Sequence, residues 1–166
     1  MRILLSLLIM VAAPFVNAAE NVANTTSKHA FLVNGGFTAG GLALGVDYEN
    51  AIHRTFGFGG YLRMYGDNDD VPQGEITAFG AFIRPHFTRQ AWDFYVSPGF
   101  GFFQEELANG DDESMIGPVF MLGLLYQLNY DMALGVEQMS IYGWFGEDAL
   151  QGQRSNEVLA KFRYSF

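Results

Sequence analysis

The sequence has no cysteine among its 166 residues, so disulfides, thiolate zinc sites and cysteine nucleophiles are excluded. Basic residues are also scarce: 9 Lys and Arg stand against 18 Asp and Glu, for a formal net charge of −9. This balance argues against a nucleic-acid partner, because neutralising phosphates needs clustered Lys and Arg. After residue 18 there is no run of the ~18 apolar residues that a membrane-spanning helix needs.

The N-terminus is typical of a secretory signal peptide. Arg2 is followed by the apolar run ILLSLLIMVAA, then by Pro14 and the small-residue stretch VNAAE. The small-x-small rule places cleavage after Ala18, with Ala19 as the alternative, and a buried first helix is the other interpretation. Removing residues 1–18 leaves 166 − 18 = 148 residues and a charge of −9 − 1 = −10. We expect residues 19–28 to form a flexible periplasmic leader and residues 29–166 to form one domain.

Aromatic residues and glycine are abundant, with 16 Phe, 8 Tyr and 20 Gly. Eight stretches, separated by polar or glycine-containing breaks, alternate with the period of a β-strand. They are HAFLVNGGF, LALGVDYE, TFGFGGYLRMY, ITAFGAFIRPHF, WDFYVSPGFGFFQEE, IGPVFMLGLLYQL, MALGVEQMSIYGWF and VLAKFRYSF. The seventh loses phase near Gln138, which predicts a bulge there, and Pro98 and Pro118 indicate either bulges or misplaced strand boundaries.

The two faces of these stretches differ in composition. One carries large aliphatic and aromatic side chains, and the other carries glycine, small residues and most of the charges. A soluble barrel buries its large residues and shows polar ones outside. The pattern instead predicts an all-β, eight-stranded antiparallel up-and-down transmembrane β-barrel with a lipid-facing apolar wall. A soluble ligand-binding barrel is the alternative.

The connections predict an orientation. On one side the connections NAIHR, TRQA and NYD are short. On the other side GDNDDVPQGE, LANGDDESM and EDALQGQRSNE are longer and acidic, and only the first connection, TAGG, is short. Short periplasmic turns and longer external loops are typical of the bacterial outer membrane, which is where we expect this chain to lie.

The last stretch alternates up to Tyr164-Ser165-Phe166, and in this it resembles the C-terminal signal that bacterial outer-membrane proteins present to their barrel-assembly machinery. Together with YVSPGFGFF and LALGVDYE, it makes the chain similar to small eight-stranded barrels of the OmpA-like and opacity-protein type. The resemblance implies that Phe162, Tyr164 and Phe166 form the assembly signal. It also implies a monomer in contact with outer-membrane lipid and lipopolysaccharide.

Charged residues on the small-residue face predict a network inside the barrel. A salt-bridged plug that fills the lumen is one interpretation, and a narrow gated pore for small solutes or ions is the other, because a buried charge must be paired or solvated. The predicted members are Asp47, Glu49, Arg63, Arg84, Asp93, Glu137, Lys161 and Arg163, together with Glu105.

No catalytic residue, metal site or cofactor is predicted. The acidic segments 66–70 and 109–113 could gather Ca²⁺ or Mg²⁺, but neither has EF-hand spacing, and a solvated acidic loop is the alternative. Ser97 is the serine nearest to His86 along the expected strands, without a convincing catalytic triad. We therefore expect a structural or surface-interaction role, with a narrow pore as the second hypothesis and a lipid-modifying enzyme as the third.

Overall fold

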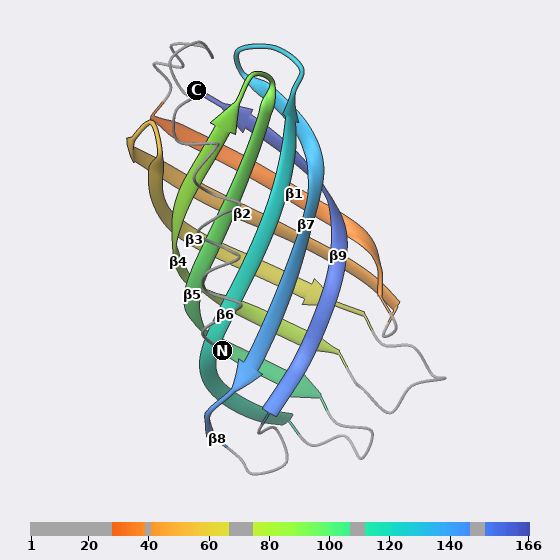
Figure 1. The fold of residues 1–166 in the computed structure, drawn as a ribbon. Coiled ribbons are helices and arrows are strands. Elements are labelled where there is room, and N and C mark those ends of the chain that lie inside the picture. The colour runs from red at the N-terminus through yellow and green to blue at the C-terminus, as the bar shows by residue number, and fades with distance from the viewer. Residues whose placement is uncertain (1–27, 39–40, 67–74, 107–111, 147–151) are drawn as a thin grey trace, which may run out of the picture.

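The computed structural model describes residues 28–38, 41–66, 75–106, 112–146 and 152–166, and these form one antiparallel β-barrel (Figure 1). Its strands are β1 (His29–Thr38), β2 (Gly41–His53), β3 (Phe56–Tyr65), β4 (Ile76–Arg89), β5 (Trp92–Glu106), β6 (Asp112–Gln127), β7 (Met132–Gly143), β8 (Phe145–Gly146) and β9 (Gly152–Ser165). Within the described ranges there is no helix of the length and hydrophobicity needed to traverse a bilayer.

The sheet closes on itself. Its strand order is β5-β4-β3-β2-β1-β9-β7-β6-β8, and a further pairing between β5 and β6 joins the two edges. The two-residue β8 follows β7 after a break at Trp144 and pairs with β6. The eight long strands therefore make the closed antiparallel barrel that the sequence pattern predicts, and closure leaves no free sheet edge.

Both described chain ends lie at the same end of the barrel. The backbone of His29 donates to the Phe166 carbonyl at 3.3 Å, and the Phe166 N–H donates back to His29 at 2.9 Å. The turns at residues 54–55, 90–91 and 128–131 share this end, because successive strands run antiparallel. We call it the turn end, and we call the opposite end, where β3, β5 and β7 finish, the loop end.

Polarity is inverted relative to a soluble barrel. On the outer wall Phe31, Leu44 and Phe79 are each about half exposed, whereas Arg63 and Arg84 are fully buried inside. Exposed and buried positions alternate along every long strand, on the faces that the sequence predicts. An apolar wall around a polar interior is the arrangement of a barrel that faces hydrocarbon.

The interior also holds large apolar side chains, which the sequence pattern did not predict. Phe82, Phe103, Met121, Met139 and Leu159 belong to a buried cluster in the loop-end half of the lumen. A second cluster fills the turn end and consists of Ala30, Leu32, Tyr95, Leu125 and Ala133. Gly59 makes room for Phe82, and Gly36 makes room for Leu159. Apolar contacts thus seal the lumen on both sides of its charged centre.

The predicted bulge near Gln138 is wrong. Burial alternates without a break from Glu137 to Gly143, and the register shift between β7 and β9 lies at Ile141 and Tyr142. The phase only seemed to be lost because Met139 and Ile141 are apolar yet point inward, while the polar Gln138 points outward.

The prolines sit at gaps in the ladder. Pro98 pairs with Phe120 of β6 in an unbroken register, and the missing pairings are on its other side, between β4 and β5. Pro118 lies where the pairing of β6 passes from β7 to β8. Proline has no backbone N–H to donate, and each of these prolines lies where the ladder has no pairing on one side.

Candidate functional site

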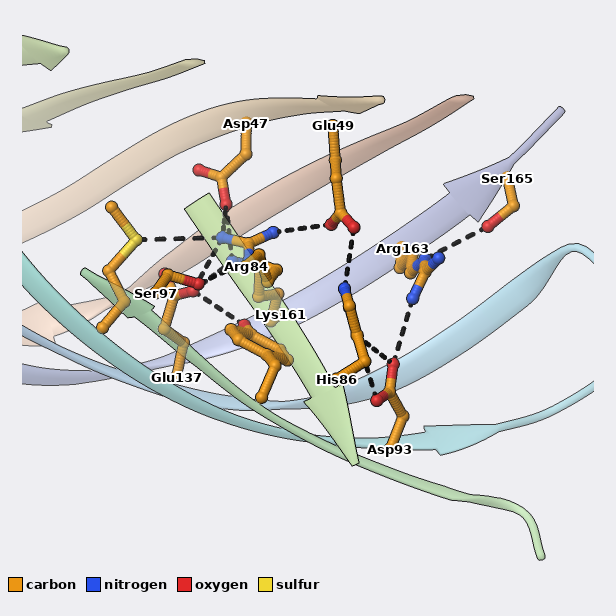
Figure 2. Close-up of polar contacts among 12 residues, drawn as sticks. Asp47, Glu49, Arg84, His86, Asp93, Ser97, Glu137, Lys161, Arg163 and Ser165 are labelled. Carbon is orange, nitrogen blue, oxygen red and sulfur yellow. Dashed lines mark hydrogen bonds and ion pairs between the residues drawn. The ribbon is translucent and has the colours of Figure 1, made fainter. Parts of the chain in front are cut away.

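Five charged side chains meet in the middle of the lumen. Asp47 of β2 binds Arg63 of β3 at 2.5 Å and Arg84 of β4 at 2.9 Å. Glu137 of β7 lies 2.8 Å from Arg63 and 3.6 Å from Arg84. Lys161 of β9 donates to Asp47 at 2.7 Å and also to Glu137. Asp47 and Glu137 thus share three cations, of which Figure 2 labels Arg84 and Lys161.

Arg84 is the most connected member of this cluster. Its Nε donates to Ser97 Oγ at 2.7 Å, and its Nη1 donates to Glu49 at 3.0 Å. The guanidinium also stacks between two rings, 4.1 Å from the centroid of Phe82 and 4.4 Å from that of Tyr95. Such stacking suits the flat, weakly hydrated guanidinium and would not suit lysine in the same way.

A second cluster lies toward the turn end and is joined to the first through Glu49. His86 Nε2 is 2.7 Å from Glu49, and its Nδ1 is 2.9 Å from Asp93. Arg163 of β9 binds Asp93 at 3.1 Å and donates to Ser165 Oγ at 3.1 Å. Both imidazole nitrogens face carboxylates, so an imidazolium that donates twice satisfies this geometry.

Acids and bases are nearly equal in number. The network contains four acids, Asp47, Glu49, Asp93 and Glu137, and four bases, Arg63, Arg84, Lys161 and Arg163, and the His86 imidazole of the second cluster lies between Glu49 and Asp93. Glu105 is also buried on the interior face, nearer the loop end of β5. Burying charges is tolerable when each has an opposite charge beside it, and each of the four acids and four bases does.

Several contributors lay outside the sequence prediction. Tyr95 donates to Glu137 at 2.7 Å, and the Asn34 amide lies within hydrogen-bonding distance of Asp47 and Arg63. Ser97 and His86 were considered only as catalytic candidates. All four occupy the inward positions of their strands, so the period-2 pattern marks them as interior, although it does not name their partners.

The geometry does not pair Ser97 with His86. The Ser97 hydroxyl accepts from Arg84, and both nitrogens of His86 are taken by carboxylates. A nucleophile–base pair needs the serine within reach of a free imidazole nitrogen. Among the described residues no group of His, Asp and Glu could hold a metal ion. Residues 67–70 and 109–111 of the two acidic segments lie outside the described ranges, so the cation hypothesis stays a prediction.

The residues predicted to form the assembly signal lie on the outer wall. Phe162 is half-buried, whereas Tyr164 and Phe166 are exposed at the turn end of β9. The ring of Phe166 stacks against that of Phe31 at 5.6 Å, across the seam between β9 and β1. The last strand thus shows an aromatic edge where the barrel closes.

No family model and no curated protein matches this chain. Solved structures do. The N-terminal β-barrel domain of Pseudomonas aeruginosa OprF is 14% identical with a TM-score of 0.64, over 84% of this chain and 98% of that one. Neisserial surface protein A is 16% identical with a TM-score of 0.63, over 83% of this chain and 94% of that one. Ail of Yersinia pestis is 11% identical with a TM-score of 0.55, over 85% and 100%.

This is the fold of the small eight-stranded outer-membrane barrels. The matches cover nearly the whole of each solved chain, so the eight strands correspond as a complete barrel. Identities this low establish architecture and assign no role to a residue. What the lumen of this chain does must therefore be argued from its own contacts.

Proposed function

We propose that this chain is an integral protein of the bacterial outer membrane with a structural or surface-interaction role, a closed lumen and no catalysis of its own. The observation that carries the proposal is the inverted polarity: large apolar side chains cover the outside, while charged ones are buried inside. In water such a wall would be a large exposed apolar surface, whereas in hydrocarbon it is favourable. Closure of the sheet supports the same conclusion, because hydrocarbon offers no partner to a free strand edge.

The contacts favour a plug over a pore. Arg63, Arg84 and Lys161 are at most 1% exposed and are bound to acids from several strands. Opening a path for ions would break these pairs and separate the apolar clusters on either side. An eight-stranded barrel has little interior space beyond its own side chains, so closure needs no additional gate.

The fold neighbours support a surface-interaction role, and the charge at the loop end narrows the kind of partner that this chain could bind. One neighbour, Ail, is named as an attachment invasion locus protein and has been solved with the heparin analogue sucrose octasulfate. At the loop end of this chain the exposed charged side chains that the structure describes are acidic: Glu75, Glu106 and Asp112. Acids repel a sulfated glycan, so we propose a surface contact of different chemistry from that one.

The same proposal has consequences for how the barrel is assembled and for the lipids that surround it. The exposed aromatic side chains of Tyr164 and Phe166 at the closing seam are suited to recognition by the barrel-assembly machinery. Outer-membrane lipid and lipopolysaccharide would surround a monomer, and the closed sheet leaves no strand edge for a second copy to pair with. Residues 1–27 lie outside the described ranges, so the signal peptide (1–18) and the leader (19–28) stay predictions.

Electrophoretic mobility tests the proposal. The envelope fraction is extracted in detergent and run on SDS gels with and without boiling. We expect a band in the outer-membrane fraction that shifts on boiling, because a closed barrel resists SDS until heated. A soluble periplasmic protein with no shift would overturn the proposal. Planar bilayers then test the plug: the purified barrel should give no stable conductance steps, and regular steps would establish the pore hypothesis instead.

A further inference from the structure

The exposed cations that the structure describes gather at the turn end. They are Lys28 before β1, Arg54 in the turn between β2 and β3, and Arg89 at the end of β4. Asp131, in the turn between β6 and β7, is the acid exposed at this end among the described residues, and it lies beside β9. The other end carries acids. The barrel is therefore polarised from end to end.

The cations are also neighbours along one side of the rim. The Lys28 carbonyl accepts from Ala51 of β2 at 2.7 Å, two residues before His53 ends that strand. The turn that holds Arg54 lies against β4, where the backbone N–H of His86 donates to the Thr55 carbonyl at 2.9 Å. Arg89 ends that same strand. The positive charges thus follow the rim from β1 to β4.

Arg89 stands next to an aromatic pair on the outer wall. It is paired across the sheet with Trp92, which is paired in turn with Tyr126 of β6. Trp92 and Tyr126 are 48% and 44% exposed, and their rings meet edge to face at 5.0 Å. Closer to the barrel centre, the rings of Phe87 and Phe94 lie 6.0 Å apart. At the rim the wall therefore presents a guanidinium beside polar-tipped aromatics, and closer to the barrel centre it presents phenyl rings.

This gradient matches a phospholipid molecule seated against the wall. A guanidinium binds phosphate oxygens with two parallel hydrogen bonds, and indole and phenol groups occupy the headgroup level of a membrane. The phenyl rings below would contact acyl chains. Basic residues near a bilayer surface attract acidic lipids.

We propose that Arg89, Trp92 and Tyr126 form a site for the headgroup of an anionic phospholipid in the periplasmic leaflet, with Arg54 and Lys28 adding attraction along the rim. The inference rests on the proposed function, since it needs the turn end to face the periplasm within an outer membrane. The ligand is a lipid and not free phosphate, because the site continues into the apolar wall. The site should not prefer a choline headgroup, because the positive charge of choline would lie beside the guanidinium of Arg89 and be repelled by it.

The two tryptophans of the chain make the test specific. Trp92 is at the proposed site, and Trp144 is exposed at the opposite end of the barrel. In Trp144→Phe, fluorescence therefore reports on Trp92 alone, and in Trp92→Phe it reports on Trp144 alone. Each variant is refolded into vesicles of phosphatidylcholine and phosphatidylglycerol in which one lipid carries brominated chains, which quench nearby tryptophan. A gel shift on boiling confirms folding in every sample.

We expect brominated phosphatidylglycerol to quench Trp92 well beyond its share of the bilayer, with local enrichment of about fivefold, which corresponds to about 1 kcal/mol at one basic residue. Adding Arg89→Gln should remove the enrichment, Arg89→Lys should keep part of it, and Trp144 should show none. Inorganic phosphate at matched ionic strength should not compete, although raised salt should weaken the preference.

The failures are distinguishable. If neither brominated lipid quenches either tryptophan, the chain has not entered the bilayer, and the proposed function fails together with the site. If both lipids quench Trp92 in proportion to their amounts, or if phosphatidylcholine is preferred, the barrel is inserted and only the lipid site is overturned. A preference that survives Arg89→Gln would also overturn the assignment to this residue.

Discussion

Arg63 and Glu137 form a 2.8 Å ion pair across the full width of the barrel. Their strands, β3 and β7, are four places apart in either direction around the closed sheet, through β2, β1 and β9 or through β4, β5 and β6. The two residues are 74 positions apart in the chain. This contact ties opposite walls together, so the network holds the cross-section of the barrel as well as filling it.

Glu137→Gln should destabilise the barrel strongly. The change leaves Arg63 and Lys161 buried with less negative charge to face, and breaking a buried pair in this way costs about 3–5 kcal/mol. The measurement is the urea concentration at which the folded band disappears in phospholipid vesicles. Glu106→Gln, which neutralises an exposed acid at the loop end, is the matched control and should stay within about 0.5 kcal/mol of the parent. Equal midpoints for the two variants would contradict an energetic role for the network.

The strands and their faces could be predicted because period 2 is a local property. In β9, Lys161 stands between the outward-facing Ala160 and Phe162, and three consecutive residues suffice to place it inside. The partner of Lys161 could not be predicted in the same way. The contact of Lys161 with Asp47 depends on the registers of β9 with β1 and of β1 with β2, and its contact with Glu137 depends on the register of β9 with β7. These registers appear in no single stretch of sequence.

Prediction failed where both faces were apolar. Met139 and Ile141 look like wall residues, yet they are fully buried inside, and the polar Gln138 just before them points outward. The period-2 pattern shows which residues share a face. It cannot show which face is inside when both faces carry apolar residues. The role of His86 in the charge network was not predicted, for a different reason. Its interior position could be read from β4, but its role depends on Glu49 and Asp93, which two other strands supply.

Gly123→Ala should also be destabilising, although glycine-to-alanine is usually mild in a strand. Tyr95 lies directly across the sheet from Gly123, and Gly123 lies directly across from Glu137. The ring of Tyr95 crosses the bare glycine to donate to Glu137, and an added Cβ would collide with that ring. Overpacking of this kind costs about 1–3 kcal/mol.

The same urea titration measures this effect, with Gly35→Ala as the control. A Cβ on Gly35 would make only ordinary contacts, at 3.4 Å to Leu44 and 3.9 Å to the Ala43 carbonyl, so we expect its midpoint to change little. Tyr95→Phe separates the contribution of the ring to stability from that of the hydroxyl, because it keeps the ring and removes the hydrogen bond to Glu137. If Gly123→Ala behaves like Gly35→Ala, the tyrosine moves freely and the network does not depend on its position.

Phe166→Ala should impair assembly more than stability. Phe166 is half exposed and contacts Phe31 and His29 at one end of a seam that backbone bonds already hold, so its ring contributes little to the folded barrel. Its exposed position at the closing strand suits recognition during biogenesis. We expect a several-fold lower yield of the heat-shifting form in cells, with the unfolding midpoint of the purified barrel lowered by about 1 kcal/mol or less.

Phe100→Ala is the control for this prediction, since Phe100 is equally exposed on the outer wall but lies within β5, away from the seam. Its yield in cells should stay close to that of the parent. Equal losses of yield in the two variants would mean that assembly responds to any missing wall aromatic, and not to the end of β9.

Ala81→Arg tests the lipid-facing wall directly. Ala81 is exposed near the middle of β4, where its outward neighbours across the sheet are Gly60 and Phe100. A cation at the midplane of a membrane barrel costs about 2–4 kcal/mol, whereas near the interface it costs about 0–1 kcal/mol. Thr77→Arg, at the loop-end side of the same face of β4, is the matched control and should be nearly neutral. Both are compared by urea midpoint in vesicles. In a soluble barrel each arginine would be one more exposed surface charge, so two neutral variants would show that this face meets water.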